Sequence, residues 1–198
     1  GSSDEPAAGA TPLVLTGVAA VGAAISGQTV EAKCSTGTGS ATSNGDGSYT
    51  VSVTDGVLPC VLKITPATGP ALHSLATGTG NSATANISPV TQLVVASLTG
   101  GDPAAYFTGF DATVAASVTD ASVTAAVSAV KTTLLAAGVD LGTIDVLAGT
   151  LVPATETTAG NAYDQALDAL AVKLETAGTS LETLTTTVAA ASPAAPPT

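Results

Sequence analysis

The chain has 198 residues, with 15 acidic and only four basic side chains, and its formal net charge is −11. All four basic residues are lysines, whereas a nucleic-acid-binding surface needs a basic footprint that neutralises phosphates. The charge therefore argues against nucleic acid as a partner, and against attraction to anionic lipid head groups. Hydrophobic residues make up 45% of the chain and aromatic residues only 3%, so a core must consist mainly of Ala, Val, Leu and Ile.

A chain of this length suits one domain or two small ones. No uninterrupted apolar run reaches the roughly 18–20 residues that a membrane-spanning helix needs, so we expect no transmembrane segment.

Residues 1–11 combine small and polar side chains and predict a flexible tether. Two interpretations of Gly1-Ser2-Ser3 stay open. These residues are either the remnant of a purification tag or the start of a segment that follows a lipidated cysteine preceding Gly1, as in many bacterial surface lipoproteins. In both cases we expect an exported protein that is extracellular or on the cell surface, where tethering to the outer membrane is one arrangement.

The first half of the chain has the patterning of β-strands. Three segments alternate apolar and polar side chains, the period of a half-buried strand. The turn sequence Asn44–Gly47 directly precedes one of them. One or two further strands are expected within Leu13–Ile25, and two short ones near the end of this half. The three alternating segments are Thr29–Cys34, Ser48–Thr54 and Cys60–Thr65, and the two short strands are Leu72–Thr77 and Ala83–Ile87.

Cys34 and Cys60 are the only cysteines, and both fall on the apolar face of their strands. Two core-facing thiols are most simply interpreted as a disulfide across a sandwich of two sheets; the alternative is a pair of buried free thiols. A disulfide would close a loop of about 25 residues, contribute about 3 kcal/mol of stability and imply an oxidising compartment. A catalytic cysteine needs a base or cation nearby, and no histidine is near either cysteine in sequence.

The segment Gly27–Lys33, followed by Thr42–Val51, resembles the carboxypeptidase-regulatory-like or bacterial Ig-like β-sandwich domains. The shared pattern is a strand that enters after a short turn as x-Gly-x-Tyr-x-Val, here residues 46–51. The resemblance covers Pro12 to Pro89, under half of the chain, and implies a β-sandwich. It implies no catalytic residue, since such modules serve as spacers, adhesion units and assembly subunits.

Helical spacing of apolar residues replaces alternation after Pro89. Ser88 is a candidate N-cap, with Pro89 at the first helical position. Gly138 and Gly178 are expected to end the two strongest helices. The expected helices span 89–98, 103–107, 120–137 and 158–177, and a short last helix begins at 180.

A β half followed by an α half predicts the α+β class, because strict βαβ alternation is missing. We expect an N-terminal Ig-like or transthyretin-like antiparallel β-sandwich over residues 12–89. A small C-terminal helical region over residues 90–192 would pack on it, and residues 193–198 would form a Pro/Ala tail.

Few residues are suited to chemistry. His73 is the only histidine, so the chain cannot build a histidine-rich metal site, and we expect a packed or strand-surface histidine. Asp164 and Asp168 stand four residues apart on an expected helix. Paired carboxylates can hydrolyse glycosides, but that chemistry needs a cleft and normally aromatic sugar platforms. We expect these two side chains on a solvated helical face.

Other motifs are weaker. Asn44–Gly47 contains part of a calcium loop but lacks the alternating oxygen ligands and the terminal Glu, so a hairpin turn is favoured. Glu31 with Lys33, or Lys63 with Asn86, would be the pairs for an intramolecular isopeptide bond, but alternation places both lysines on the outward face. The sequence has no Gly-rich phosphate loop, zinc signature or nucleophile elbow. We therefore expect no catalytic residue, no metal and no cofactor.

Tyr106, Phe107 and Phe110 account for three of the five aromatic residues. We expect them to plug the junction between the helices and the sandwich. If they were exposed, they would be the first candidate surface for a partner.

These features favour a non-enzymatic extracellular or cell-surface protein with a structural or adhesive role. Its expected partners are copies of itself or other surface proteins. In a sharper version the chain forms a filament or oligomer by strand addition, and the apolar segment with Leu13, Leu15 and Val18 completes a neighbour's sheet. The alternative is a periplasmic or surface-tethered protein that binds a small ligand between the sandwich and the helices.

Overall fold

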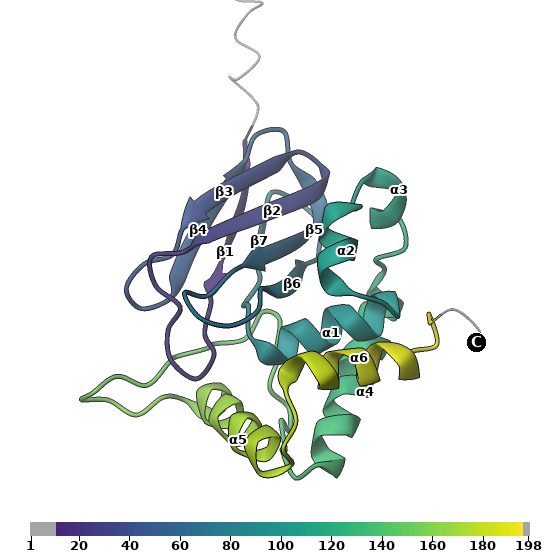
Figure 1. Ribbon diagram of the computed structural model, residues 1–198. Coiled ribbons are helices and arrows are strands. Elements are labelled where there is room, and N and C mark those ends of the chain that lie inside the picture. The colour runs from purple at the N-terminus through teal and green to yellow at the C-terminus, as the bar shows by residue number, and fades with distance from the viewer. Residues whose placement is uncertain (1–10, 196–198) are drawn as a thin grey trace, which may run out of the picture.

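The computed structural model describes residues 11–195, and it places two β-sheets before a group of helices (Figure 1). Residues 1–10 and 196–198, which hold most of the expected tether and part of the expected tail, lie outside the described residues. The predicted α+β class is confirmed. The strands are β1 (Leu13–Val18), β2 (Thr29–Thr36), β3 (Thr38–Thr42), β4 (Ser48–Val53), β5 (Val57–Ile64), β6 (Leu72–Ala76) and β7 (Ser82–Thr84). The helices are α1 (Pro89–Thr99), α2 (Pro103–Thr108), α3 (Ala112–Ala115), α4 (Asp120–Ala136), α5 (Ala162–Thr176) and α6 (Leu181–Ala191).

The strands form two sheets, one in the order β4-β1-β7 and the other in the order β3-β2-β5-β6. β1 pairs antiparallel with β4 along its whole length and parallel with β7 over three residue pairs. The expectation of a wholly antiparallel sandwich is therefore wrong for β7. The chain crosses from β6, in the other sheet, to β7, and this crossover lets β7 run parallel to β1.

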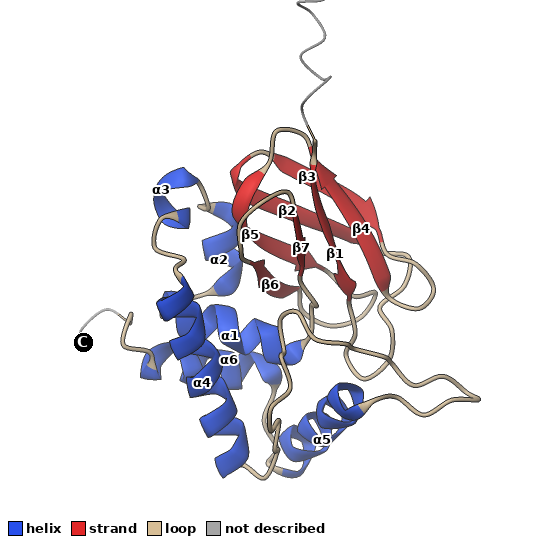
Figure 2. Ribbon diagram, turned by 180° about the vertical axis from the view of Figure 1, so that it is seen from behind, coloured by secondary structure: helices blue, strands red, loops and turns tan. Residues whose placement is uncertain are grey.

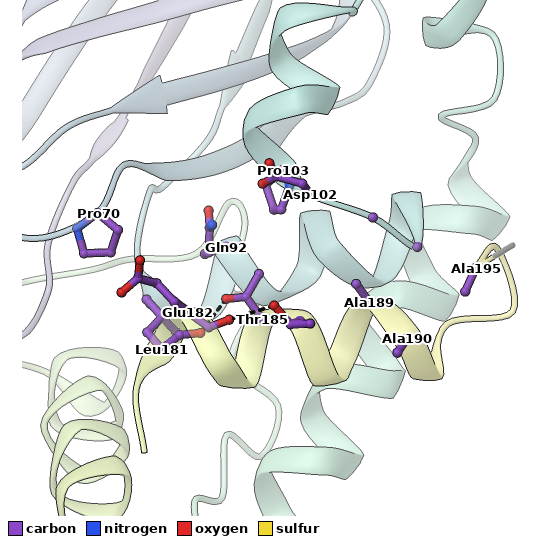
Figure 3. Close-up of a pocket in the computed structure, with 13 residues that line it drawn as sticks. Pro70, Gln92, Asp102, Pro103, Leu181, Glu182, Thr185, Ala189, Ala190 and Ala195 are labelled. Carbon is purple, nitrogen blue, oxygen red and sulfur yellow. Dashed lines mark hydrogen bonds between the residues drawn. The ribbon is translucent and has the colours of Figure 1, made fainter. Parts of the chain in front are cut away.

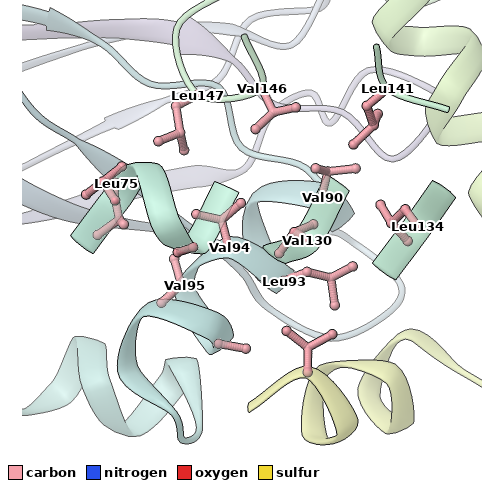
Figure 4. Packing of buried hydrophobic residues seen from close by; sticks show 14 of the residues in the cluster. Leu75, Val90, Leu93, Val94, Val95, Val130, Leu134, Leu141, Val146 and Leu147 are labelled. Carbon is pink, nitrogen blue, oxygen red and sulfur yellow. The ribbon is translucent and has the colours of Figure 1, made fainter. Parts of the chain in front are cut away.

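The four-stranded sheet is covered on both faces at β5 and β6, whereas β3 has no buried residue. Toward the other sheet, Leu62 and Ile64 pack with Leu13, Leu15 and Val51, and all five are 0% exposed. On the opposite face, β5 and β6 contribute Val61 and Leu75 to a second core that the helices build (Figure 4). As a result, β6 is buried at every position.

Helix α1 lies between this sheet and the helices α4 and α6, and views from both sides show it close to them (Figures 1 and 2). The helices α2 and α3 contact the sheet directly. Its residues from Val90 to Ser97 are all buried, as expected for a helix surrounded by protein. Ser88 caps it as predicted, and the Thr91 hydroxyl donates to the carbonyl of His73, 2.8 Å away. This bond fixes the start of α1 on β6.

The cysteines are joined by a disulfide, but not across the sandwich. Cys34 and Cys60 are directly paired residues of β2 and β5, so the bond links neighbouring strands of one sheet. Alternation identifies the face that a residue occupies and does not identify its neighbouring strand. A disulfide is typical of an oxidising compartment. None of the helices in the described residues is both long and apolar enough to span a membrane.

Replacing both cysteines in a Cys34→Ala/Cys60→Ala variant should lower the free energy of unfolding by about 3 kcal/mol, because the bond closes a loop whose ends are 26 residues apart in sequence. Urea unfolding followed by circular dichroism measures this difference. Wild-type protein unfolded with a reductant keeps both sulfur atoms and should lose a similar amount. An unchanged urea midpoint in both samples would contradict this role.

Candidate functional site

A groove of about 610 Å³ lies between α6, the end of α1 and the connection from α1 to α2 (Figure 3). Leu181 and Ala189 of α6 line one side, and Pro103 lines the side formed by the α1–α2 connection. Gln92 of α1 contributes a polar group between these sides. A concave, largely apolar surface with few polar groups is typical of a site for a small ligand.

The threonines of α6 are not free to act as nucleophiles. The hydroxyl of Thr185 donates to the carbonyl of Leu181 at 2.6 Å, and that of Thr186 donates to Glu182 at 3.1 Å. Both bonds point back along the helix, and no base contacts either hydroxyl. The groove therefore offers a surface for binding and lacks an activated group for covalent chemistry.

Gln92 connects the groove to the buried histidine. Its side-chain oxygen accepts from the backbone N–H of His73 at 2.8 Å and lies 2.9 Å from Nδ1 of the same residue. An amide oxygen can only accept, so Nδ1 carries the proton and Nε2 has none. Burial lowers the pKa of His73, the charge of Lys63 lowers it further, and the bond to Gln92 acts in the opposite direction.

His73 is therefore neutral at pH 7 and only 1% exposed, which makes it a packed histidine. Its Nε2 has no hydrogen-bond partner within the described part of the chain. It is not accessible as a base or as a ligand.

The aromatic residues occupy the junction that the sequence predicts for them. Phe107 and Phe110 are buried, and the Phe107 ring lies 6.1 Å from the His73 ring. The ammonium groups of Lys33 and Lys63 lie 5.5 and 5.4 Å from the centre of the Phe107 ring, within range of a cation–π interaction. Lys33 also donates to the carbonyl of Thr108 at 2.8 Å, so these lysines hold α2 on the sheet.

The pairs considered for an isopeptide bond are not arranged for one. Lys63 forms a partly exposed ion pair with Glu31 at 3.8 Å. Asn86 lies elsewhere, because its side chain donates to the carbonyl of Gly149 at 2.6 Å and accepts from the N–H of Val18 at 3.1 Å. The segment Asn44–Gly47 forms the predicted turn before β4, in which Asp46 accepts from the N–H and the hydroxyl of Ser48.

The proposed assembly residues of the N-terminal segment lie in β1. Leu13 and Leu15 are fully buried in the sandwich core, while Val18 is half-buried beside the helical core. For Asp164, the expectation of a solvated face is wrong, because its side chain is 0% exposed. Asp168 is exposed as expected.

Sequence reasoning did not identify the groove. Beyond Leu181 and Glu182, its α6 side is lined by small side chains four residues apart, namely Thr185 with Ala189 and Thr186 with Ala190. Such a stripe is a signal that a helix leaves space at its surface, but it does not say which element lies opposite. Within the described residues there is no cluster of three or more His, Cys, Asp or Glu side chains suited to a metal ion. The chain matches no protein family, no curated protein and no solved structure.

Substitution of two neighbouring glycines, Gly100 and Gly101, gives a matched pair of variants in the α1–α2 connection that lines the groove. Gly100 has a positive φ of 69°, and a Cβ there would lie 2.6 Å from the carbonyl carbon of Ala194, whereas Gly101 faces open space. A Gly100→Ala variant should lose at least about 1 kcal/mol of stability from the backbone strain alone. Gly101→Ala should change stability by under about 0.5 kcal/mol. Thermal unfolding compares them, and equal midpoints would contradict the left-handed backbone conformation at Gly100.

Proposed function

We propose that this chain is a non-enzymatic structural protein of the cell surface or extracellular space, which assembles with copies of itself by exchange of β1. The observation that carries the proposal is the position of β1. It is the first of the described strands, yet it lies in the middle of its sheet, between β4 and β7. Since β1 precedes all the other described strands, its departure would unthread none of them.

The side chains of β1 make this exchange specific. Leu13 and Leu15 fill the sandwich core, and the backbone of β1 bonds both neighbouring strands. Without β1, the sheet would present two unpaired edges and an apolar slot, a combination that strand addition fills. The same strand of another copy matches this slot in length, register and side chains.

The segment after β1 is suited to change direction. Gly22 and Gly27 have positive φ values of 108° and 70°, which glycine adopts without strain. A hinge in this connection would let β1 extend away from its own sheet, as in domain swapping.

The strand order supports a transthyretin-like sandwich over the Ig-like alternative. In immunoglobulin domains the first two strands share a sheet, whereas here β1 and β2 lie in different sheets. The disulfide supports export, because such bonds persist in oxidising compartments. The burial of His73 and the engaged threonines of α6 support a role without catalysis.

A paired-cysteine experiment tests the exchange. Thr16 and Thr50 are exposed residues directly opposite each other on β1 and β4. In assembled protein, oxidation of a Thr16→Cys/Thr50→Cys variant should join different copies and give a ladder of covalent oligomers on a non-reducing gel.

The control pair is Thr29→Cys/Thr42→Cys, which joins exposed, directly opposite residues of β2 and β3. Neither of these strands is exchanged, so this bond should close within one chain and give a monomer band. Monomer bands from both variants, at concentrations where the protein assembles, would refute exchange of β1.

A second candidate function, binding of a small ligand, is favoured by the groove beside α6. The side chain of Gln92, which lines the groove, forms hydrogen bonds only through its oxygen, so its amide N–H groups have no partner among the described residues. The matching ligand is a neutral, largely apolar molecule with a hydrogen-bond acceptor.

Nile red, a neutral apolar dye with a carbonyl, is a suitable probe of this groove. Ala190 is exposed and lines the groove, whereas Ala191 is exposed and does not. Ala190→Leu should lower the affinity for the dye at least about tenfold, because the added side chain fills the space. Ala191→Leu should bind like the wild type. Equal fluorescence titrations of both variants would exclude the groove as the binding site.

A further inference from the structure

Asp164 is a carboxylate that the fold buries and only partly satisfies. It follows Asn161, whose side-chain oxygen caps α5 by accepting from the N–H of Asp164 at 3.2 Å. Its Oδ2 accepts from the N–H of Ala154 at 3.3 Å. Its Oδ1 is buried and has no partner in the described part of the chain.

The two carboxylate oxygens have different surroundings. The segment from Ala154 to Gly160 meets Oδ2, and Gly160 lies so close that any side chain there would collide with the carboxylate. Oδ1 therefore points away from this segment. The side chain of Asp164 is 0% exposed, so Oδ1 has lost its contact with bulk water and has gained no hydrogen bond from residues 11–195 in return.

Asp168 stands one helical turn further along the same side of α5. The connection between β1 and β2 approaches it closely, because a Cβ on Gly22 would lie 2.6 Å from its Oδ1. Both ribbon views place this connection beside α5 (Figures 1 and 2). Neither carboxylate forms an ion pair within residues 11–195, where the one salt bridge joins Lys63 and Glu31.

Two neighbouring carboxylates without a cationic partner are energetically unfavourable. Burial raises the pKa of Asp164, and the negative charge of Asp168 raises it further, while the bond from Ala154 opposes the shift. A buried charge needs a partner, and an unpaired carboxylate oxygen loses its hydration without compensation. A proton on one carboxylate would neutralise only that side chain, whereas a bound cation would interact with both carboxylates.

We propose that Asp164 and Asp168 bind a divalent cation of the calcium type, with Oδ1 of Asp164 as its buried ligand. Calcium accepts carboxylate, carbonyl and water oxygens in flexible geometry, which suits two side chains of one helix beside the backbone at Gly22. The ion ties α5 to the connection between β1 and β2. Extracellular calcium modules have dissociation constants of about 10⁻⁴–10⁻³ M, and we expect this range. This proposal does not depend on the exchange of β1.

Calcium titration of the full chain, by calorimetry and by thermal unfolding at pH 7, tests the site. Calcium at ten times the dissociation constant should raise the wild-type midpoint by about 3–5 °C. Asp164→Asn should abolish the binding heat and the shift, and Asp168→Asn should weaken binding at least about tenfold. Glu175→Gln removes one charge from an exposed position of the same helix and should bind like the wild type.

A second measurement distinguishes calcium binding from protonation of Asp164. Without calcium, Asp164→Asn should be more stable than the wild type at pH 7, since it removes the uncompensated buried charge. The raised pKa of the folded state means that wild-type stability falls as the pH rises from the unfolded value toward the folded one. Calcium should reverse this loss. A more stable Asp164→Asn with no calcium binding to the wild type would overturn the proposal, as would equal calcium shifts in the wild type, Asp164→Asn and Glu175→Gln.

Discussion

The position of β5 and β6 between two hydrophobic cores is the constraint on which the rest of the structure depends. Successive residues of β5 point alternately to the sandwich core and to the helical core, so Leu62 and Val61 serve different cores although they are neighbours in sequence. The strand β6 is buried throughout and carries His73, whose carbonyl and N–H groups bond to α1. Neither strand can move without disturbing both cores, so this sheet is the fixed part of the molecule.

The three-stranded sheet, in the order β4-β1-β7, is not shared between the two cores in the same way. Leu13 and Leu15 of β1 belong to the sandwich core alone, and the helices add only a contact with the half-buried Val18. Loss of β1 from its own sheet would therefore leave the helical core and its groove beside α6 in place. This difference supports our proposal that β1 is the strand exchanged between copies, and it would separate assembly from any ligand binding in the groove.

Some of this organisation could be predicted from the sequence, because an element that is buried on one face has regularly spaced apolar residues. Alternation locates β2 and β4, and the capping pattern at Ser88 locates the start of α1. The strand β3 (Thr38–Thr42) was not predicted, since it has no large apolar residue and owes its conformation to pairing with β2.

Contacts between segments that are distant in sequence produce no such regular spacing of apolar residues. Alternation placed Cys34 and Cys60 on the correct face, but it could not show that their strands are neighbours in one sheet and do not face each other across the sandwich. Helical spacing placed Asp164 beside Asp168, but it could not show the loop that buries Asp164. The most direct test of the account is the particle size of the native protein, by light scattering with negative-stain microscopy. It predicts filaments or ordered oligomers far above the 18.7 kDa of one chain. A single species of that mass at all concentrations would contradict it.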